Sequence, residues 1–108
     1  MVSINEFAAI DLRIGKIIEV ADLENARHPM YRLKIDLGEL GTKNVVAGIK
    51  DAYTKEQLLN SFVVVVANLD SKKVANFTSE GMILAAEDGS NIVLLRPDRE
   101  LTLGSRVR

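Results

Sequence analysis

The sequence predicts an all-β fold: a small barrel of about five short strands, with one short helix between the third and fourth strands and short flanking segments at the termini. Several runs rich in Val, Ile and Leu have the length and alternation of strands, and turn residues separate them. Only one mid-chain segment has a well-marked helix start. With 108 residues, 47% of them hydrophobic, the chain can form one domain, residues 1–108, but not two.

The first half of the chain contains three predicted strands. Residues 11–20 are rich in Ile, Leu and Val, and Gly15 interrupts them, which predicts a bulge or a sharp bend. Residues 31–37 (YRLKIDL) alternate apolar and charged side chains, so they are the clearest strand of the chain. A glycine-containing turn follows, and residues 44–49 are predicted to return from it as a third strand.

The helix and the remaining strands lie in the second half. Residues 54–60 begin with the T-x-x-Q spacing of a capping box and should form the short helix. Residues 62–69 are apolar on both faces, as expected of a strand covered on both sides. Residues 82–86 and 92–95 are further strands, joined by an Asp88-Gly89 turn of the kind that hairpins favour. Strands in this order, with a helix between the third and the fourth, are typical of the five-stranded OB barrel.

The residues offer little for catalysis. Cysteine is absent, and His28, which precedes Pro29, is the only histidine, so no metal site, catalytic triad or thiol nucleophile can be assembled. No glycine-rich phosphate loop is present either. We therefore expect a binding module, not an enzyme, with no catalytic residue, cofactor or metal. The sequence has no signal-peptide pattern at its N-terminus and no apolar run long enough to span a bilayer, so we expect a cytoplasmic protein without membrane contact.

One group of polar residues remains as a candidate binding site. The net charge is −1 and argues against binding of nucleic acid by bulk electrostatics alone, but the middle third of the chain is mildly basic. Ammonium groups there could contact phosphates, and amide or hydroxyl groups could donate hydrogen bonds to RNA. On pattern alone, an ordinary polar loop stays an open alternative. The group consists of Asn68, Lys72, Lys73, Ser79 and Glu80, with Met82 just beyond it.

Seven segments, in the same order, resemble the tRNA-binding domain that is appended to many methionyl-tRNA synthetases and is also found as a free dimeric protein. The resemblance runs from about residue 6 to the end of the chain, and the fourth-strand and S-E-G-M blocks include Asn68, Ser79, Glu80 and Met82 of the polar group just described. The segments are 11–17 (DLRIGKI), 31–38 (YRLKIDLG), 46–49 (VAGI) with the helix after it, 65–69 (VVANL), 79–86 (SEGMILAA), 95–98 (LRPD) and 104–105 (GS).

The resemblance implies an OB fold that binds the outer corner of tRNA by its shape and not by its anticodon. It implies tRNA as the partner, and an accessory or beta subunit of the methionyl-tRNA synthetase type, with the synthetase itself as a second partner. The positions that match the RNA-binding pattern of the family are Arg13, Lys34, Asn68, Lys72, Lys73, Ser79 and Met82.

Two other binding functions stay open. Residues 25–31 (NARHPMY) are similar to the loop before the second strand of the CsaA-type chaperones, which bind unfolded peptides as dimers, whereas 47–49 and 79–82 resemble the tRNA-binding branch. A general binder of single strands is the third possibility, but it needs stacking aromatics, and this chain has three Phe, two Tyr and no Trp.

Apolar residues outside the predicted barrel core favour a homodimer. The S-x-x-E spacing at residues 3–6 predicts a helical turn that presents Ile4 and Phe7 to a partner surface. Residues 63–66 and 92–95 also have more two-sided apolar character than one small barrel should need. Exposed apolar surface of that kind marks interfaces, so Ile4 and Phe7 are the predicted interface residues.

Overall fold

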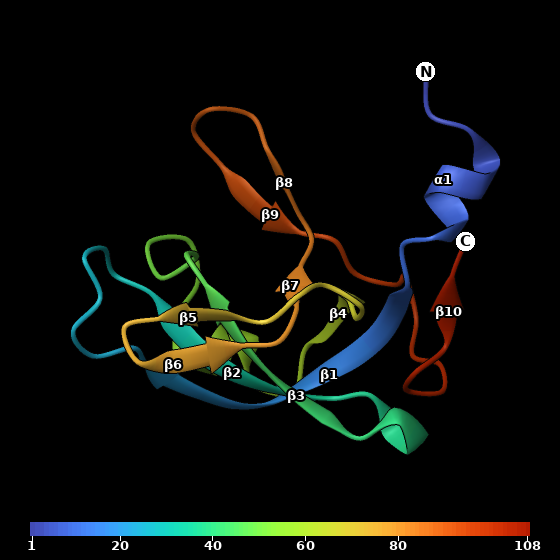
Figure 1. The fold of residues 1–108 in the computed structure, drawn as a ribbon. Coiled ribbons are helices and arrows are strands. Elements are labelled where there is room, and N and C mark those ends of the chain that lie inside the picture. The colour runs from blue at the N-terminus through green and yellow to red at the C-terminus, as the bar shows by residue number, and fades with distance from the viewer.

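A computed structural model describes residues 1–108 and confirms the all-β fold with a nearly closed five-stranded antiparallel barrel (Figure 1). The barrel strands pair in the order β3-β2-β1-β4-β7. The predicted strands 11–20, 31–37 and 44–49 are confirmed within two residues at most ends. The strands are β1 (Leu12–Asp22), β2 (Tyr31–Asp36), β3 (Thr42–Ala47), β4 (Phe62–Val66) and β7 (Met82–Ile83).

Other elements flank the barrel. Both capping boxes are present: the hydroxyls of Ser3 and Thr54 each accept from a backbone N–H three residues on. The sequence patterns did not predict the β5–β6 hairpin or the terminal strand β10, which pairs with β1. Neither helix is long enough to span a membrane. The flanking elements are α1 (Ile4–Ala8), a 3-10 turn (Gly38–Leu40), α2 (Lys55–Leu58), β5 (Lys72–Val74), β6 (Phe77–Ser79), β8 (Ala85–Glu87), β9 (Ile92–Leu94) and β10 (Arg106–Val107).

Strand β1 organises the barrel because its two halves pair with different neighbours: the first half with β4 and the second with β2. The bulge predicted at Gly15 is in the wrong place, since the register shift falls between Ile17 and Glu19. Gly15 has another role. A Cβ at this position would lie 2.5 Å from the Cγ2 atom of Ile35, so the barrel packs against the bare backbone of Gly15.

The two-sided burial predicted for β4 is confirmed. Val63 and Val65 point into the barrel core, and Val64 and Val66 belong to a second cluster on the outside of the strand. That cluster is covered by residues of the same chain, among them Val107 of β10. The inference that residues 63–66 need a partner subunit is therefore wrong, because one chain already buries them.

Side chains close the barrel between β3 and the segment that leads into β7. The Ser79 hydroxyl accepts a hydrogen bond from the Val46 N–H at 3.0 Å, and the Glu80 carboxylate accepts one from the Asn44 N–H at 2.8 Å. The Glu80 N–H in turn donates to the Asn44 carbonyl at 2.7 Å. These bonds satisfy the free edge of β3 and hold the preceding β5–β6 hairpin beside it.

Candidate nucleic-acid interface

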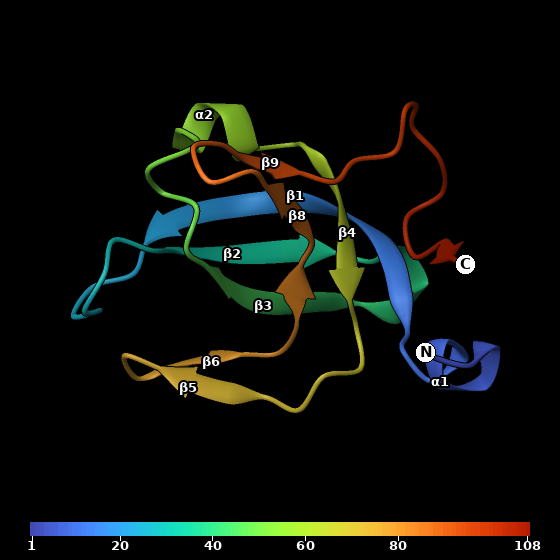
Figure 2. The same cartoon turned by 90° about the horizontal axis from the view of Figure 1, so that it is seen from above.

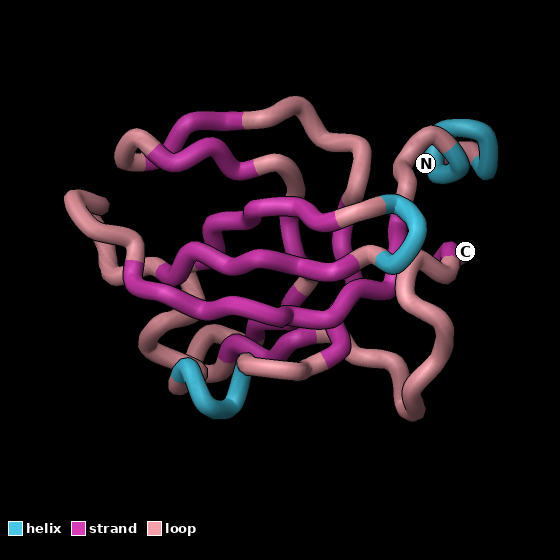
Figure 3. Tube along the Cα trace, turned by 90° about the horizontal axis from the view of Figure 1, so that it is seen from below, coloured by secondary structure: helices cyan, strands magenta, loops and turns pink.

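The candidate interface is the outer face of β2 and β3 together with the β5–β6 hairpin. Figures 2 and 3 show the hairpin lying along β3, with its turn at the same end of the barrel as the 23–30 loop between β1 and β2. In OB folds, the face of strands two and three and the loops that border it are where oligonucleotides bind. The hairpin occupies the connection between the fourth and fifth barrel strands, so this barrel has both bordering loops.

The outer face of β2 carries two basic residues. Leu33 and Ile35 point into the core, so Arg32 and Lys34 point outward by the alternation of the strand. The side chain of Lys34 is 39% exposed, and its ammonium lies 3.8 Å from the carboxylate of Glu19. Because that ion pair is long and exposed to solvent, it is weak, and the Lys34 ammonium can contact a phosphate instead.

Lys72 and Lys73 are both exposed, but they lie on opposite faces of the β5–β6 ribbon. Lys72 pairs with Ser79 and Lys73 with Thr78, and paired residues share a face. Ser79 faces the edge of β3, so Lys72 is the lysine turned toward the barrel, and Lys73 is turned away. A single flat surface could not contact both equally.

Three of the other predicted RNA-binding residues have internal partners. Arg13 donates to the Asp11 carboxylate at 2.7 Å and to the Gly104 carbonyl at 3.0 Å, which ties the start of β1 to the C-terminal segment. The Asn68 amide accepts from the Asp11 N–H at 2.9 Å and donates to the Ala9 carbonyl at 2.8 Å. Ser79 is 9% exposed, and its hydroxyl accepts the hydrogen bond from the Val46 N–H that helps to close the barrel. The structure gives each of these three a bond that organises the fold, and their contact with RNA stays a prediction.

Met82 lies apart from the basic face. It pairs with Val66 on β4 and is 47% exposed on the outside of the barrel, whereas its neighbour Ile83 points into the core. Of the predicted set, Lys34 lies on the outer face of β2 and Lys72 on the side of the bordering hairpin that faces the barrel, with Lys73 on the opposite side of the same hairpin. The structure leaves Arg13, Asn68 and Met82 elsewhere.

Two residues of the face were missed by sequence reasoning. The guanidinium carbon of Arg32 lies 5.6 Å from the ring centroid of Phe77, a cation–π contact between β2 and β6. The signal for Arg32 was available, because it occupies an outward position of the clearest predicted strand. Phe77 could not be found in this way, since no pattern predicted the hairpin that carries it.

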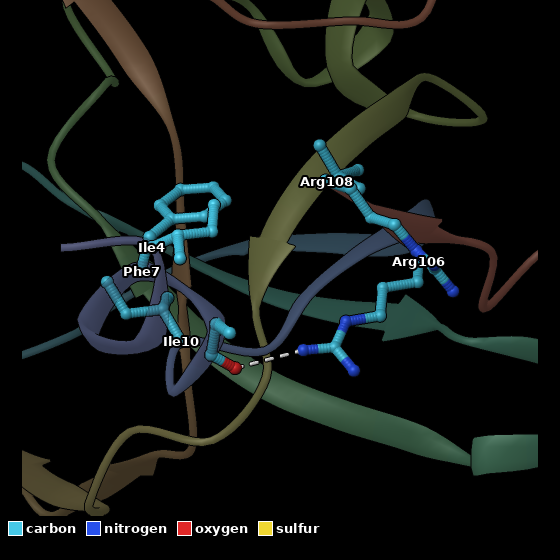
Figure 4. A pocket seen from close by; sticks show the side chains of 7 residues that line it. Ile4, Phe7, Ile10, Arg106 and Arg108 are labelled. Atoms are coloured by element: carbon cyan, nitrogen blue, oxygen red, sulfur yellow. Dashed lines mark hydrogen bonds between the residues drawn. The ribbon is translucent and has the colours of Figure 1, made fainter.

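The predicted interface residues Ile4 and Phe7 border a groove between α1 and the C-terminal strand (Figure 4). Ile4 is 78% exposed and Phe7 39% exposed, and α1 buries none of its residues. The Arg106 guanidinium donates to the Ala8 carbonyl at 3.1 Å across this groove. The helix is thus fixed to the barrel through few contacts, and its apolar side chains remain available to a partner.

An ion-pair cluster lies at the end of β1. The Lys50 and Lys55 ammonium groups lie 2.8 and 3.1 Å from the Asp22 carboxylate, and their hydrogen bonds hold the pKa of Asp22 below its ordinary value. The same pair raises the pKa of Lys50. One carboxylate balances only one of the two ammonium charges, so this cluster keeps a net positive charge at the end of β1. No cluster of three or more His, Asp or Glu suited to a metal ion is present.

A nearly closed five-stranded barrel with basic side chains on its second strand and on the bordering hairpin defines an OB-fold binding module. The comparison with known families agrees and is more specific: residues 12–106 match the family described as "Putative tRNA binding domain". The chain belongs to this tRNA-binding domain family.

Relatives and solved structures are similar over almost the whole chain. It is 54% identical over 108 residues to a methionine–tRNA ligase of Pyrococcus furiosus, covering 99% of the chain but 14% of the ligase. The structure of the CsaA chaperone protein of Picrophilus torridus has a TM-score of 0.94 and 39% identity, with 100% of both chains covered. A MetRS-related protein of Pyrococcus horikoshii has a TM-score of 0.91 and 25% identity, covering 100% of this chain and 98% of that one.

Proposed function

We propose that this chain is a tRNA-binding module that recognises the shape of tRNA. The observation that carries the proposal is the position of Lys34 and Lys72 on the surface that OB folds use for oligonucleotides, in a chain of the tRNA-binding domain family. Local basic groups are sufficient for contacts to a backbone and to 2′-hydroxyls, so a net charge of −1 is compatible with this function. Arg13, Asn68 and Ser79 support the site through the fold.

Salt-dependent tRNA binding tests this proposal. We expect Lys72→Ala with Lys73→Ala to weaken binding and to lower the salt slope, because each lost phosphate contact removes about 0.7–0.9 released counterions. Of the two single substitutions, Lys72→Ala should weaken binding more than Lys73→Ala, since Lys72 faces the barrel. Arg99→Ala is the matched control, because Arg99 is exposed and pairs only with the adjacent Asp98. Failure of the wild-type chain to retain tRNA at low salt would refute the function, and an unchanged slope would remove the two lysines from the interface.

We further propose that the module works with a methionyl-tRNA synthetase, as an accessory or beta subunit, and that it is not itself an enzyme. The support is the identity of about half the residues to methionine–tRNA ligases, of which the chain spans 14%. Because tRNA is charged where proteins are made, we propose the cytoplasm as the location of this module. Aminoacylation by a synthetase catalytic chain, assayed with and without this chain, tests the partnership: we expect a lower KM for tRNA and no activity from this chain alone.

Binding of unfolded peptides is the second candidate function. The likeness to a CsaA chaperone, with full coverage of both chains, favours it specifically. Competition separates the two candidates: labelled tRNA and a labelled unfolded polypeptide are each offered to the protein. Retention of the polypeptide but not of tRNA would support the chaperone function over ours.

We also propose that the chain forms a homodimer through the α1 groove. Ile4 and Phe7 are exposed beside Val107 of the last strand, so a second copy could bury them. Light scattering should give twice the monomer mass for the full chain at micromolar concentration, and the monomer mass for a chain lacking residues 1–8. A full chain of monomer mass would contradict the proposal.

A further inference from the structure

A cleft opens between the 23–30 loop and the turn of the β5–β6 hairpin. It has a volume of about 340 Å³, and Arg32 and Phe77 form part of its wall, with Glu24 and Asn25 on one side and Asn76 on the other. Such a volume is at the small end of the range of about 300–1,000 Å³ for ligand clefts. The cleft is therefore large enough for one nucleotide, but not for a duplex.

The hairpin turn directs Phe77 toward the cleft. Ala75 and Asn76 have φ values of 50° and 69°, so both central residues of the turn are left-handed. That geometry matches the twist of a two-residue hairpin and brings Phe77 opposite Val74, on the inner face of the ribbon. Alanine is an unfavourable residue for this conformation, so the turn is specified by the surrounding hairpin and not by the preference of Ala75. Phe77 is half-buried, so part of its ring is accessible.

The charges of the cleft favour a base over a phosphate. Phe77 and the Arg32 guanidinium are planar groups in a cation–π contact, and groups of both kinds stack on nucleobases. Glu24 also borders the cleft and its carboxylate disfavours a phosphate there, whereas the Asp22 carboxylate is paired with Lys50 and Lys55. Glu24 makes no salt bridge, so its oxygens can accept from an amino or imino N–H of a base.

We propose that this cleft binds one unpaired nucleobase of the RNA, stacked on the Phe77–Arg32 pair, while Lys34 and Lys72 contact the flanking phosphates. The proposal rests on the proposed function and adds to it a site for an extruded or unstacked base. Glu24 and the amides of Asn25 and Asn76 are the groups that would contact its edge. Because all four RNA bases carry an N–H donor on that edge, these groups would hold a base without selecting one of the four.

Substitutions of Phe77 and Arg32 test the site by tRNA affinity. Phe77→Ala should weaken tRNA binding about 5- to 150-fold, the effect of one lost stacked base, and leave the salt slope unchanged because no phosphate contact is lost. Phe77→Leu keeps apolar bulk without an aromatic face and should behave like Phe77→Ala. Arg32→Lys keeps the charge but loses the plane, so we expect weaker binding at the same slope. Thermal unfolding of each variant checks that the barrel is intact.

Fluorescence gives a second readout, because the wild-type chain contains no tryptophan. Phe77→Trp places a single indole in the cleft, and a stacked base should quench its emission. The probes are unfractionated tRNA and a single-stranded RNA hexamer of mixed sequence. Quenching by the hexamer supports the cleft even if the wild type fails to retain tRNA, an outcome that would refute only the proposed function. Wild-type affinity for tRNA in Phe77→Ala and Phe77→Leu, or an indole that neither RNA quenches, would overturn the cleft proposal.

Discussion

Replacing Ser79 with Ala separates a role in the fold from a role in RNA contact. The resemblance to the family assigned Ser79 to RNA binding, but the structure buries it to 9% exposure and directs its hydroxyl to the edge of β3. In Ser79→Ala, the Val46 N–H loses the acceptor that lies at 3.0 Å. The same hydroxyl also donates to the Gly81 carbonyl at 3.3 Å, so a second, weaker bond is lost.

The cost follows from the partner that is left behind. A buried or part-buried donor without an acceptor destabilises a protein by about 1–3 kcal/mol. For a domain near this size, each kcal/mol lowers the Tm by roughly 4–8 °C, so Ser79→Ala should lower it by about 5–20 °C. Thr78→Ala is the matched control, because Thr78 precedes Ser79 on the same strand but is exposed on the opposite face of the ribbon.

Urea and thermal unfolding of the two variants measure the cost, and tRNA affinity is measured at a temperature where both are folded. We expect Ser79→Ala to lose stability and to keep its affinity within about two-fold, whereas Thr78→Ala should change neither by more than about 0.5 kcal/mol. A Ser79→Ala protein as stable as the wild type would refute the barrel-closing role. Lost affinity at unchanged stability would show instead that the hydroxyl contacts RNA.

Two further predictions concern the barrel and its ion pairs. Gly15→Ala should lower the free energy of unfolding by about 1–3 kcal/mol in urea denaturation, because the new Cβ would lie 2.5 Å from Ile35; unchanged stability would show that the core adapts. The lowered pKa of Asp22, caused by hydrogen bonds from Lys50 and Lys55, makes its ionised form stabilising above the ordinary pKa of 3.8, and that contribution is lost as the pH falls through the folded-state pKa. Asp22→Asn should therefore be less stable than the wild type at neutral pH, and the difference should vanish below that pKa; a difference independent of pH would show that the two lysines do not stabilise the fold through the Asp22 charge.

Much of the fold could be predicted because its signals are local. The alternation of residues 31–37 indicated β2 and its two faces, and two capping boxes marked both helices. The two-sided valines of β4 predicted burial on both faces, although not that the same chain supplies the second cover. That cover comes from Leu84 and Val107, far from β4 in the sequence, so no local pattern could identify it.

The candidate site was less predictable than the fold. Lys34 and Lys72 stay predicted RNA contacts, and residue type alone could not distinguish an exposed polar side chain from one bonded within the fold. Arg13 and Ser79 show the difference: their partners are Gly104 and Val46, 91 and 33 positions away. Phe77 was missed because its strand has only three residues and no clear alternation.

The sequence by itself determined the fold class, the main strands and the tRNA-binding domain resemblance, because hydrophobic periodicity and capping act over a few neighbouring residues. Only the tertiary structure decided which polar groups face solvent. Closing the barrel engages Ser79 and Glu80 at the edge of β3, because the backbone N–H groups of that edge need acceptors and these two side chains provide them. The same closure places Phe77 against Arg32 and so forms the cleft, through contacts between strands that no short stretch of sequence contains.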